Sequence, residues 1–271
     1  MMEFRTNFHT HTPRCNHASG EEREYIENAV RLGLTALGFS DHSPYIFDGD
    51  YYSGFRMRPE QLEDYVNTLL ALREEYKDRI RIYIGLEAEY YPALFGRLLD
   101  FLKTYPIDYL IQGQHLLGNE IGGVYCGEPT EDPRTLTAYV NQVIEGMETG
   151  AFLYLAHPDL IHFTGDQTLY KEEMKRLCRS AKRLGIPLEI NMLGIGTHRN
   201  YPEPLFWEAA GEEGCKAVIG SDAHAPERIL IPEVLQKAEE IACSNKLELI
   251  DPEELLRCSG RNLKDVNKCY E

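Results

Sequence analysis

Residues 4–42 read FRTNFHTHTPRCNHASGEEREYIENAVRLGLTALGFSDH, in which two short apolar runs flank an amphipathic helix pattern. The expected elements are a strand over 4–8, a helix over 21–32 that closes at Gly33, and a strand over 36–39. Each strand runs into a polar segment that contains histidine, His9-Thr-His11 after the first and Ser40-Asp41-His42 after the second. A strand, a helix and another strand in this order predict a βαβ unit with parallel strands.

The same alternation of apolar runs and helix patterns continues along the chain. Further strands are expected over 80–86, 109–111, 152–155, 187–190 and 217–219, and further helices over 59–76, 133–149, 169–184, 203–213, 232–244 and 252–258. Seven strands alternating with helices predict an α/β barrel, one strand short of the usual eight. An open doubly wound sheet is the alternative. Both folds bind ligands at the carboxyl ends of their strands, so the residues at those ends form the candidate site.

The bulk composition favours one globular domain over residues 1–271, because 43% hydrophobic and 27% charged residues are ordinary for such proteins. No apolar run is long enough to cross a membrane, and residues 1–11 lack a signal-peptide pattern, so a cytoplasmic location is expected. Seven cysteines without a CxxC pair argue against disulfides and thiolate metal sites. A net charge of −16 disfavours nucleic acid as a partner, since such a chain repels phosphate backbones.

The histidines are concentrated at the predicted strand ends, where two carboxylates accompany them. The candidate metal ligands are His9, His11, His17, His42, Glu87, His115, His157, Asp222 and His224. Clustered imidazole and carboxylate groups without thiolates are the ligand set of zinc, manganese or iron at a hydrolytic site. The sequence therefore predicts that one face of the barrel holds a metal centre.

Two pairs of candidate ligands are separated by one residue, His9-x-His11 and Asp222-x-His224. Alternate residues of an extended chain point the same way, so both members of a pair can reach one cation. Glu87 follows an apolar run, where a carboxylate is costly unless it is paired or bound to metal. We expect Glu87 to bridge two cations, and Glu89, on the same face of the strand, is its competitor.

Basic residues in the loops beyond the strands are candidates for substrate binding. Arg199 and His198 follow the sixth strand, and Arg58 follows the second, with Arg56 nearby. A guanidinium can bind phosphate bidentately, although each arginine also suits an ordinary surface position. The tyrosine-rich loop 45–55 is either a lid over the substrate or a packed excursion.

Three further residues lie near the candidate ligands in the sequence. Asp41 is a candidate for orienting a ligand from behind. His162 is expected to be an ordinary loop residue, and Cys15 an incidental thiol.

Taken together, the motifs resemble those of a known superfamily. In order they are His9-x-His11, His17, Ser40-Asp41-His42, Gly85-Leu-Glu87, Gln114-His115, His157-Pro158 and Gly220-Ser221-Asp222-Ala-His224. Their order and spacing over residues 6–228 resemble the PHP superfamily (polymerase and histidinol phosphatase), and the chain length resembles its stand-alone histidinol-phosphatase branch. The resemblance implies a distorted (β/α)7 barrel with its metal site at the carboxyl ends of the strands.

The resemblance also implies two to three divalent cations, of zinc, manganese or iron. One cation would bind His9, His11, Glu87 and Asp222, a second Glu87, His115 and His157, and a third His17, His42 and His224. The segment His157-Pro158-Asp-Leu-Ile-His162 departs from the branch, which often has leucine after the histidine and a basic residue beyond it. This departure leaves the exact substrate open.

The implied activity is metal-dependent hydrolysis of a phosphomonoester, with L-histidinol phosphate as the favoured substrate and phosphate as a product. Bound cations would lower the pKa of a shared water, and the resulting hydroxide would attack phosphorus. Arg199, His198 and Arg58 would bind the substrate, while Glu87, Asp222 and His224 would form the catalytic centre. Either His224 or Asp222 would protonate the leaving oxygen.

Three other functions are compatible with the same ligands. The chain could be a PHP phosphoesterase that acts on nucleotides or another small phosphate ester. It could be a metal-dependent amide or C–N hydrolase, but such sites usually contain a carboxylated lysine at a strand end, and no lysine occupies one here. A non-catalytic metal-binding module is the third alternative, and a phosphatase assay distinguishes it from the enzymes.

Overall fold

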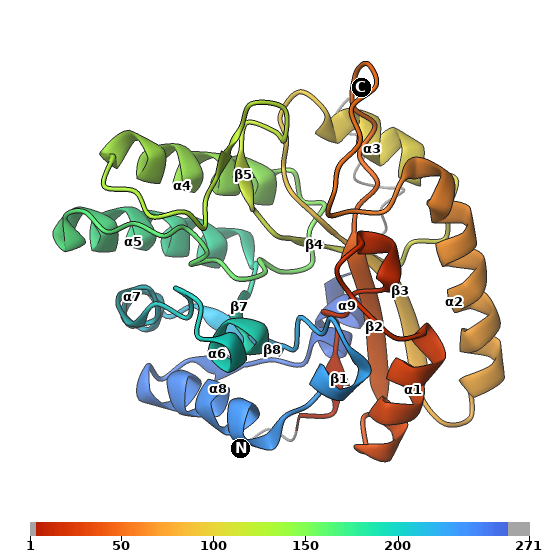
Figure 1. The fold of residues 1–271 in the computed structure, drawn as a ribbon. Coiled ribbons are helices and arrows are strands. Elements are labelled where there is room, and N and C mark those ends of the chain that lie inside the picture. Colours follow the sequence, from red (N-terminus) through yellow and green to blue (C-terminus); the bar gives the residue numbers. More distant parts are fainter. Residues whose placement is uncertain (1–3, 260–271) are drawn as a thin grey trace.

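The computed structural model describes residues 4–259 and has parallel strands at its centre with helices around them (Figure 1). One sheet has the order β1-β2-β3-β4, with β1 at Thr6–Asn7, β2 at Ala36–His42, β3 at Arg81–Ala88 and β4 at Tyr109–Gln112. A second has the order β7-β8-β9, at Leu188–Asn191, Lys216–Gly220 and Glu248–Leu249. All neighbours in both sheets are parallel, as the alternation of strands and helices predicts.

Single-residue bridges connect these two sheets on both sides. Leu155 forms parallel bridges with Gln112 of β4 and with Leu188 of β7. On the opposite side, Thr10 bridges to Ala223 beyond the end of β8. The strands therefore form one curled parallel sheet. Residues 152–155, expected as a full strand, take part only through these bridges.

The helices surround the strands, with α1 and α2 on one side and α4 and α5 on the other (Figure 1). Their bounds are α1 Glu22–Arg31, α2 Leu62–Tyr76, α3 Phe95–Leu102, α4 Pro133–Glu148, α5 Gln167–Leu184, α6 Met192–Thr197, α7 Pro204–Glu213, α8 Pro232–Ser244 and α9 Pro252–Ser259. Short 3-10 helices occupy Pro13–Cys15, Pro59–Gln61 and Pro226–Arg228. The predicted helices are confirmed, but α3 and α6 are additional.

Capping residues explain where several helices begin and end. The carboxylates of Asp132 and Asp166 accept hydrogen bonds from the first backbone N–H groups of α4 and α5. At the other end of α5, Gly185 adopts a φ of 66°, which glycine reaches without steric cost. These local signals are present in the sequence itself, and they account for the accuracy of the predicted helix ends.

The hydrophobic core has three parts. One packs α1, α2 and α3 on β2 and β3, and a second packs α4, α5, α7 and α8 on β7 and β8. A smaller third cluster combines Phe8, which follows β1, with side chains from β2, β4 and β8 and with Leu153, Tyr154 and Ala156. Because this cluster joins strands from both sheets, it holds the curled arrangement together. None of the described helices is long and apolar enough to cross a membrane.

One element near the site was not predicted. Residues Leu116–Leu117 form β5 and residues Val124–Tyr125 form β6, which pair as an antiparallel hairpin. Leu116 lies opposite Tyr125 in this hairpin. The two strands are too short to give a recognisable alternation of apolar and polar residues, which explains why the sequence did not reveal them.

Candidate metal centre

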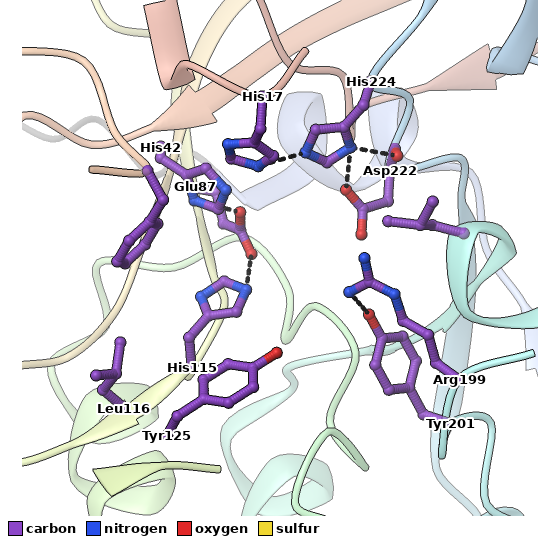
Figure 2. Close-up of a pocket in the computed structure, with 12 residues that line it drawn as sticks. His17, His42, Glu87, His115, Leu116, Tyr125, Arg199, Tyr201, Asp222 and His224 are labelled. Atoms are coloured by element: carbon purple, nitrogen blue, oxygen red, sulfur yellow. Dashed lines mark hydrogen bonds and ion pairs between the residues drawn. The ribbon is translucent and has the colours of Figure 1, made fainter. Parts of the chain in front are cut away.

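The nine predicted ligand residues come together at the carboxyl ends of the strands. A cavity of about 320 Å³ is lined by His17, His42, Glu87, His115, Asp222 and His224 (Figure 2). His9, His11 and His157 are almost completely buried and contact these residues. The structure therefore brings together side chains from segments that are far apart in the sequence.

Four side-chain atoms converge between β1, β3 and β8. Asp222 Oδ1 lies 3.1 Å from His11 Nε2 and 3.6 Å from His9 Nε2. Glu87 Oε2 lies 3.7 Å from each of these nitrogens. Ligands about 2.1 Å from a tetrahedral cation are roughly 3.4 Å apart, so the spacing suits one bound ion.

The hydrogen bonding of these atoms tests whether a cation fits. His9 Nε2, His11 Nε2 and Glu87 Oε2 are buried, and none has a hydrogen-bond partner within residues 4–259. A buried polar atom without a partner costs about 1–3 kcal/mol. A cation at this point would satisfy all three atoms, so the residues present fit a metal ion.

Glu87 also reaches a second group of nitrogens. Its Oε1 lies 2.8 Å from His157 Nε2 and 3.7 Å from His115 Nε2. Its Oε2 lies 3.0 Å from His42 Nδ1. The carboxylate therefore stands between several imidazoles, which is the position required of a bridging ligand.

A third group of imidazoles lies at the cavity surface. His17 Nε2 and His224 Nε2 are 3.0 Å apart, and the rings of His17 and His42 have centroids separated by 5.4 Å (Figure 2). His11 also has a ligand atom within 4.8 Å of ligand atoms of His42 and His224. His11 thus lies between the first and third groups.

The histidines of the cluster differ in their proton affinity. Burial opposes protonation of His9, but the charges of Glu189 and Asp222 raise its pKa to about 10. Burial also acts against His11, but the adjacent carboxylates of Asp222 and Asp41 still raise its pKa well above the usual value. Burial lowers the pKa of His224 to about 3. The nearby carboxylates thus favour the protonated form of His9 and His11, whereas burial favours the neutral form of His224.

Three further carboxylates contact candidate ligand histidines at their Nδ1 atoms. Glu189 of β7 is fully buried, and its Oε1 lies 2.7 Å from His9 Nδ1. Glu89 Oε1 lies 2.9 Å from His115 Nδ1, and Asp41 Oδ1 lies 3.4 Å from His11 Nδ1. Such partners fix the ring orientation and leave the opposite nitrogen free to bind metal.

Two glycines make room for these carboxylates. A Cβ atom on Gly113 would lie 1.8 Å from Glu87 Oε1, and one on Gly220 would lie 1.8 Å from Glu189 Oε1. Any side chain at either position would displace a carboxylate from the cluster. The glycines are therefore part of the geometry of the site.

Replacement of Glu189 by glutamine is expected to lower metal affinity about 10- to 100-fold, the effect typical of a residue that orients a ligand. The amide keeps the volume but removes the charge that faces His9 Nδ1. Competition with a chelator of known affinity measures the change. Glu248→Gln is the control, because Glu248 is exposed and pairs with Lys216. Equal affinities of both variants would contradict this role for Glu189.

The three predicted substrate-binding residues lie in different parts of the structure. Arg199 lines the cavity, and its Nη1 donates to the hydroxyl of Tyr201 at 2.9 Å. His198 is exposed at the C-terminal end of α6 and does not line the cavity. Arg58 lies over the exposed ring of Tyr52 and lines a different depression. Of the three, the structure brings only Arg199 to the cavity that the candidate metal ligands line.

Arg56 is buried, not a surface arginine. Its guanidinium donates to Glu89 Oε2 at 3.0 Å, to Glu120 Oε1 at 2.5 Å and to the carbonyl of Ser43 at 2.9 Å. Because Glu89 also contacts His115, Arg56 supports a candidate ligand instead of meeting the substrate.

The loop 45–55 is partly packed and partly exposed. Tyr45 is buried and its hydroxyl donates to the backbone carbonyl of Glu89, while Tyr51 and Tyr52 are exposed. Phe55, at the end of the loop, lines the cavity. The first part of the loop is thus a packed excursion, and its last residue belongs to the site.

Sequence reasoning missed several residues of the site. Glu189 has the signal that revealed Glu87, a carboxylate in an apolar strand. The other missed residues are Phe55, Leu116, Tyr125, Leu193 and Tyr201, which line the cavity. These apolar and aromatic residues have no such signal, because their positions depend on the packing of distant segments.

Comparison with known proteins places this geometry in a family. The PHP domain model matches residues 7–192. A probable histidinol-phosphatase of Deinococcus radiodurans is 29% identical over 242 residues, which cover 82% of this chain and 86% of that protein. A probable histidinol-phosphatase of Schizosaccharomyces pombe is 26% identical over 248 residues, covering 82% and 81%.

Solved structures share the fold. The histidinol phosphate phosphatase of Lactococcus lactis, complexed with zinc, L-histidinol and phosphate, superposes with a TM-score of 0.72 at 18% identity, covering 91% of this chain and 95% of that one. A putative histidinol phosphatase of Listeria monocytogenes gives 0.71 at 20% identity, covering 85% and 99%. With the family model matching more than half of its residues, the chain belongs to the PHP domain family.

Proposed function

We propose that this chain is a metal-dependent phosphomonoesterase that hydrolyses L-histidinol phosphate to L-histidinol and phosphate. The observation that carries the proposal is the convergence of seven imidazoles and two carboxylates on one cavity that Arg199 also lines. The names of the relatives in Deinococcus radiodurans and Schizosaccharomyces pombe support this substrate, since both alignments span most of each protein.

Two to three divalent cations, of zinc, manganese or iron, would bind in this centre. His9, His11, Glu87 and Asp222 would hold one, Glu87, His115 and His157 a second, and His17, His42 and His224 a third. When bound, the cations supply an activated water and neutralise charge on the phosphoryl oxygens. The unpartnered atoms of His9, His11 and Glu87 support the first of these sites.

The remaining steps belong to residues of the chain itself. Arg199 would donate to a phosphoryl oxygen with the N–H groups that Tyr201 does not occupy, and so orient the ester. His224 or Asp222 would take up the proton that the attacking water loses and pass it to the leaving alcohol oxygen. Both residues line the cavity, and His224 Nδ1 lies 3.4 Å from Asp222 Oδ1.

We further propose that residues 1–271 form one domain in the cytoplasm, built as a distorted (β/α)7 barrel. The bridges of Leu155 to β4 and β7 and of Thr10 to Ala223 support a closed ring of seven strands. The metal centre would then occupy the carboxyl end of this ring, as the positions of Glu87 near the end of β3 and of Asp222 after β8 suggest.

The proposal is tested by phosphate release from L-histidinol phosphate, compared with sugar phosphates and nucleotides, and with metal content measured on the same sample. We expect selective release from L-histidinol phosphate by protein that contains two to three cations per chain. Release mainly from nucleotides or sugar phosphates would keep the chemistry and refute the substrate. Absence of both metal and hydrolysis would refute the proposal as a whole.

A further inference from the structure

The side of the cavity that faces away from His17 and His224 is apolar. Figure 2 shows Leu116, Tyr125 and Tyr201 on this side, with Arg199 beside Tyr201. We use the name apolar wall for the apolar and aromatic residues that line the cavity, which are Phe55, Leu116, Tyr125, Leu193 and Tyr201. None of these residues is a candidate metal ligand, so the wall is available to the organic part of a substrate.

The structure positions the wall before any ligand binds. Leu116 and Tyr125 are directly opposite each other in the β5–β6 hairpin, so their side chains share one face. The ring of Phe55 lies 4.5 Å from the guanidinium carbon of the buried Arg56. Tyr201 is 3% exposed and accepts a hydrogen bond from Arg199. Tyr125, by contrast, is 43% exposed and marks the open side of the cavity.

The charges around the cavity disfavour a buried ammonium group. Among the described residues that line it, the only carboxylates are Glu87 and Asp222, both candidate metal ligands, and the only arginine or lysine is Arg199. With divalent cations bound, the inner end of the cavity would attract a phosphate dianion and repel an amine. An ammonium group placed there would lose hydration and gain no carboxylate partner.

We propose that the site selects its substrate by a planar ring that contacts the apolar wall, while an amino group of the substrate projects toward the open side at Tyr125. This inference rests on the proposed function and specifies its substrate class, phosphate monoesters of short alcohols that bear a planar ring. Aromatic side chains bind such rings in offset or edge-to-face contact. Tyr125 is the specificity-determining residue, because its exposed ring becomes covered when the substrate ring binds.

Three esters separate the contributions of the ring and the amine. L-histidinol phosphate has both groups, 3-(imidazol-4-yl)propyl phosphate lacks the amine, and L-alaninol phosphate lacks the ring. We expect kcat/KM of the first two to agree within about threefold, since the amine has no partner. The ring-free ester should lose about 50- to 100-fold, the effect of removing roughly 100 Å² of buried apolar surface.

Variants of Tyr125 in the hairpin test whether the apolar wall causes the loss of kcat/KM for the ring-free ester. Tyr125→Ala should raise KM for L-histidinol phosphate about tenfold, with kcat changed by less than about twofold, because uniform binding is lost. Tyr125→Phe should restore KM, and the kinetics with L-alaninol phosphate should not respond to either change. Val124→Ala is the control, since Val124 lies in the same strand, is 52% exposed and does not line the cavity.

The outcomes distinguish this inference from the proposed function. A loss of more than about 30-fold on removal of the amine, or equal kcat/KM for L-alaninol phosphate and L-histidinol phosphate, would overturn the inference and leave the phosphatase activity intact. An unchanged KM in Tyr125→Ala would overturn the role of Tyr125. No phosphate release from any of the three esters would refute the proposed function, and this inference with it.

Discussion

Replacing Asp222 with alanine is expected to abolish phosphate release and to remove bound metal. Asp222 is one of two carboxylates in the cluster, and its Oδ1 lies within 3.1 Å of His11 Nε2 and 3.6 Å of His9 Nε2. Without it, a cation would meet mainly neutral imidazoles. We expect kcat/KM to fall by at least about 1,000-fold, more than the 10- to 100-fold typical of residues that only orient a ligand.

Two further variants make this result interpretable. Asp222 has a φ of 50°, which asparagine tolerates better than alanine, so Asp222→Asn separates loss of charge from backbone strain. His162→Ala is the control for a histidine outside the cavity lining. Metal content by elemental analysis and phosphate release are measured on each protein. Normal turnover by a metal-free Asp222→Ala protein would refute the scheme.

Metal binding is expected to release about two protons per chain at pH 7. In the metal-free protein, burial opposes protonation of His9, but Glu189 and Asp222 raise its pKa to about 10. The pKa of His11 is also well above its usual value. Both rings must be neutral to bind a cation, so the cation displaces their protons. Affinity should therefore rise about 100-fold per pH unit near neutrality, and the increase should diminish as pH approaches the pKa of His9.

Calorimetry in buffers of different ionisation enthalpy counts the released protons, and chelator competition at several pH values gives the slope of affinity against pH. Glu189→Gln is a matched variant, because the raised pKa of His9 depends on the charge of Glu189. It should release fewer protons than the wild type. An affinity that does not change between pH 6 and 8 would contradict the protonated state of His9 and His11.

The sequence predicted the fold to the extent that local signals specify it. Glycine at the end of α5 and proline or aspartate at the start of α4 mark helix ends, and apolar runs mark buried strands. The candidate ligands were predictable because most of them follow such a run. A charged or imidazole group at the end of a buried strand needs a partner, and that need is visible without coordinates.

The rest of the site was not predictable for physical reasons. Phe55, Tyr125 and Tyr201 line one cavity only because three segments that are far apart in the sequence pack together, and no residue pattern within one segment indicates this. Arg56 and Arg58 are separated by one residue, yet the first is buried and the second exposed. Their different roles arise from Glu89 and Glu120, which lie far along the chain.

The segments that follow β1 and β8 are joined by backbone hydrogen bonds. His11 N–H donates to the carbonyl of Ala223 at 2.9 Å, and Ala223 N–H donates to the carbonyl of His9 at 3.2 Å. The side chains of His9, His11 and Asp222, on either side of this junction, are candidate ligands of one cation. Such a cation would act as a crosslink between the two ends of the sheet and would lower the entropy gained when they separate. Without the cation, we expect local unfolding of the sheet to begin at this junction.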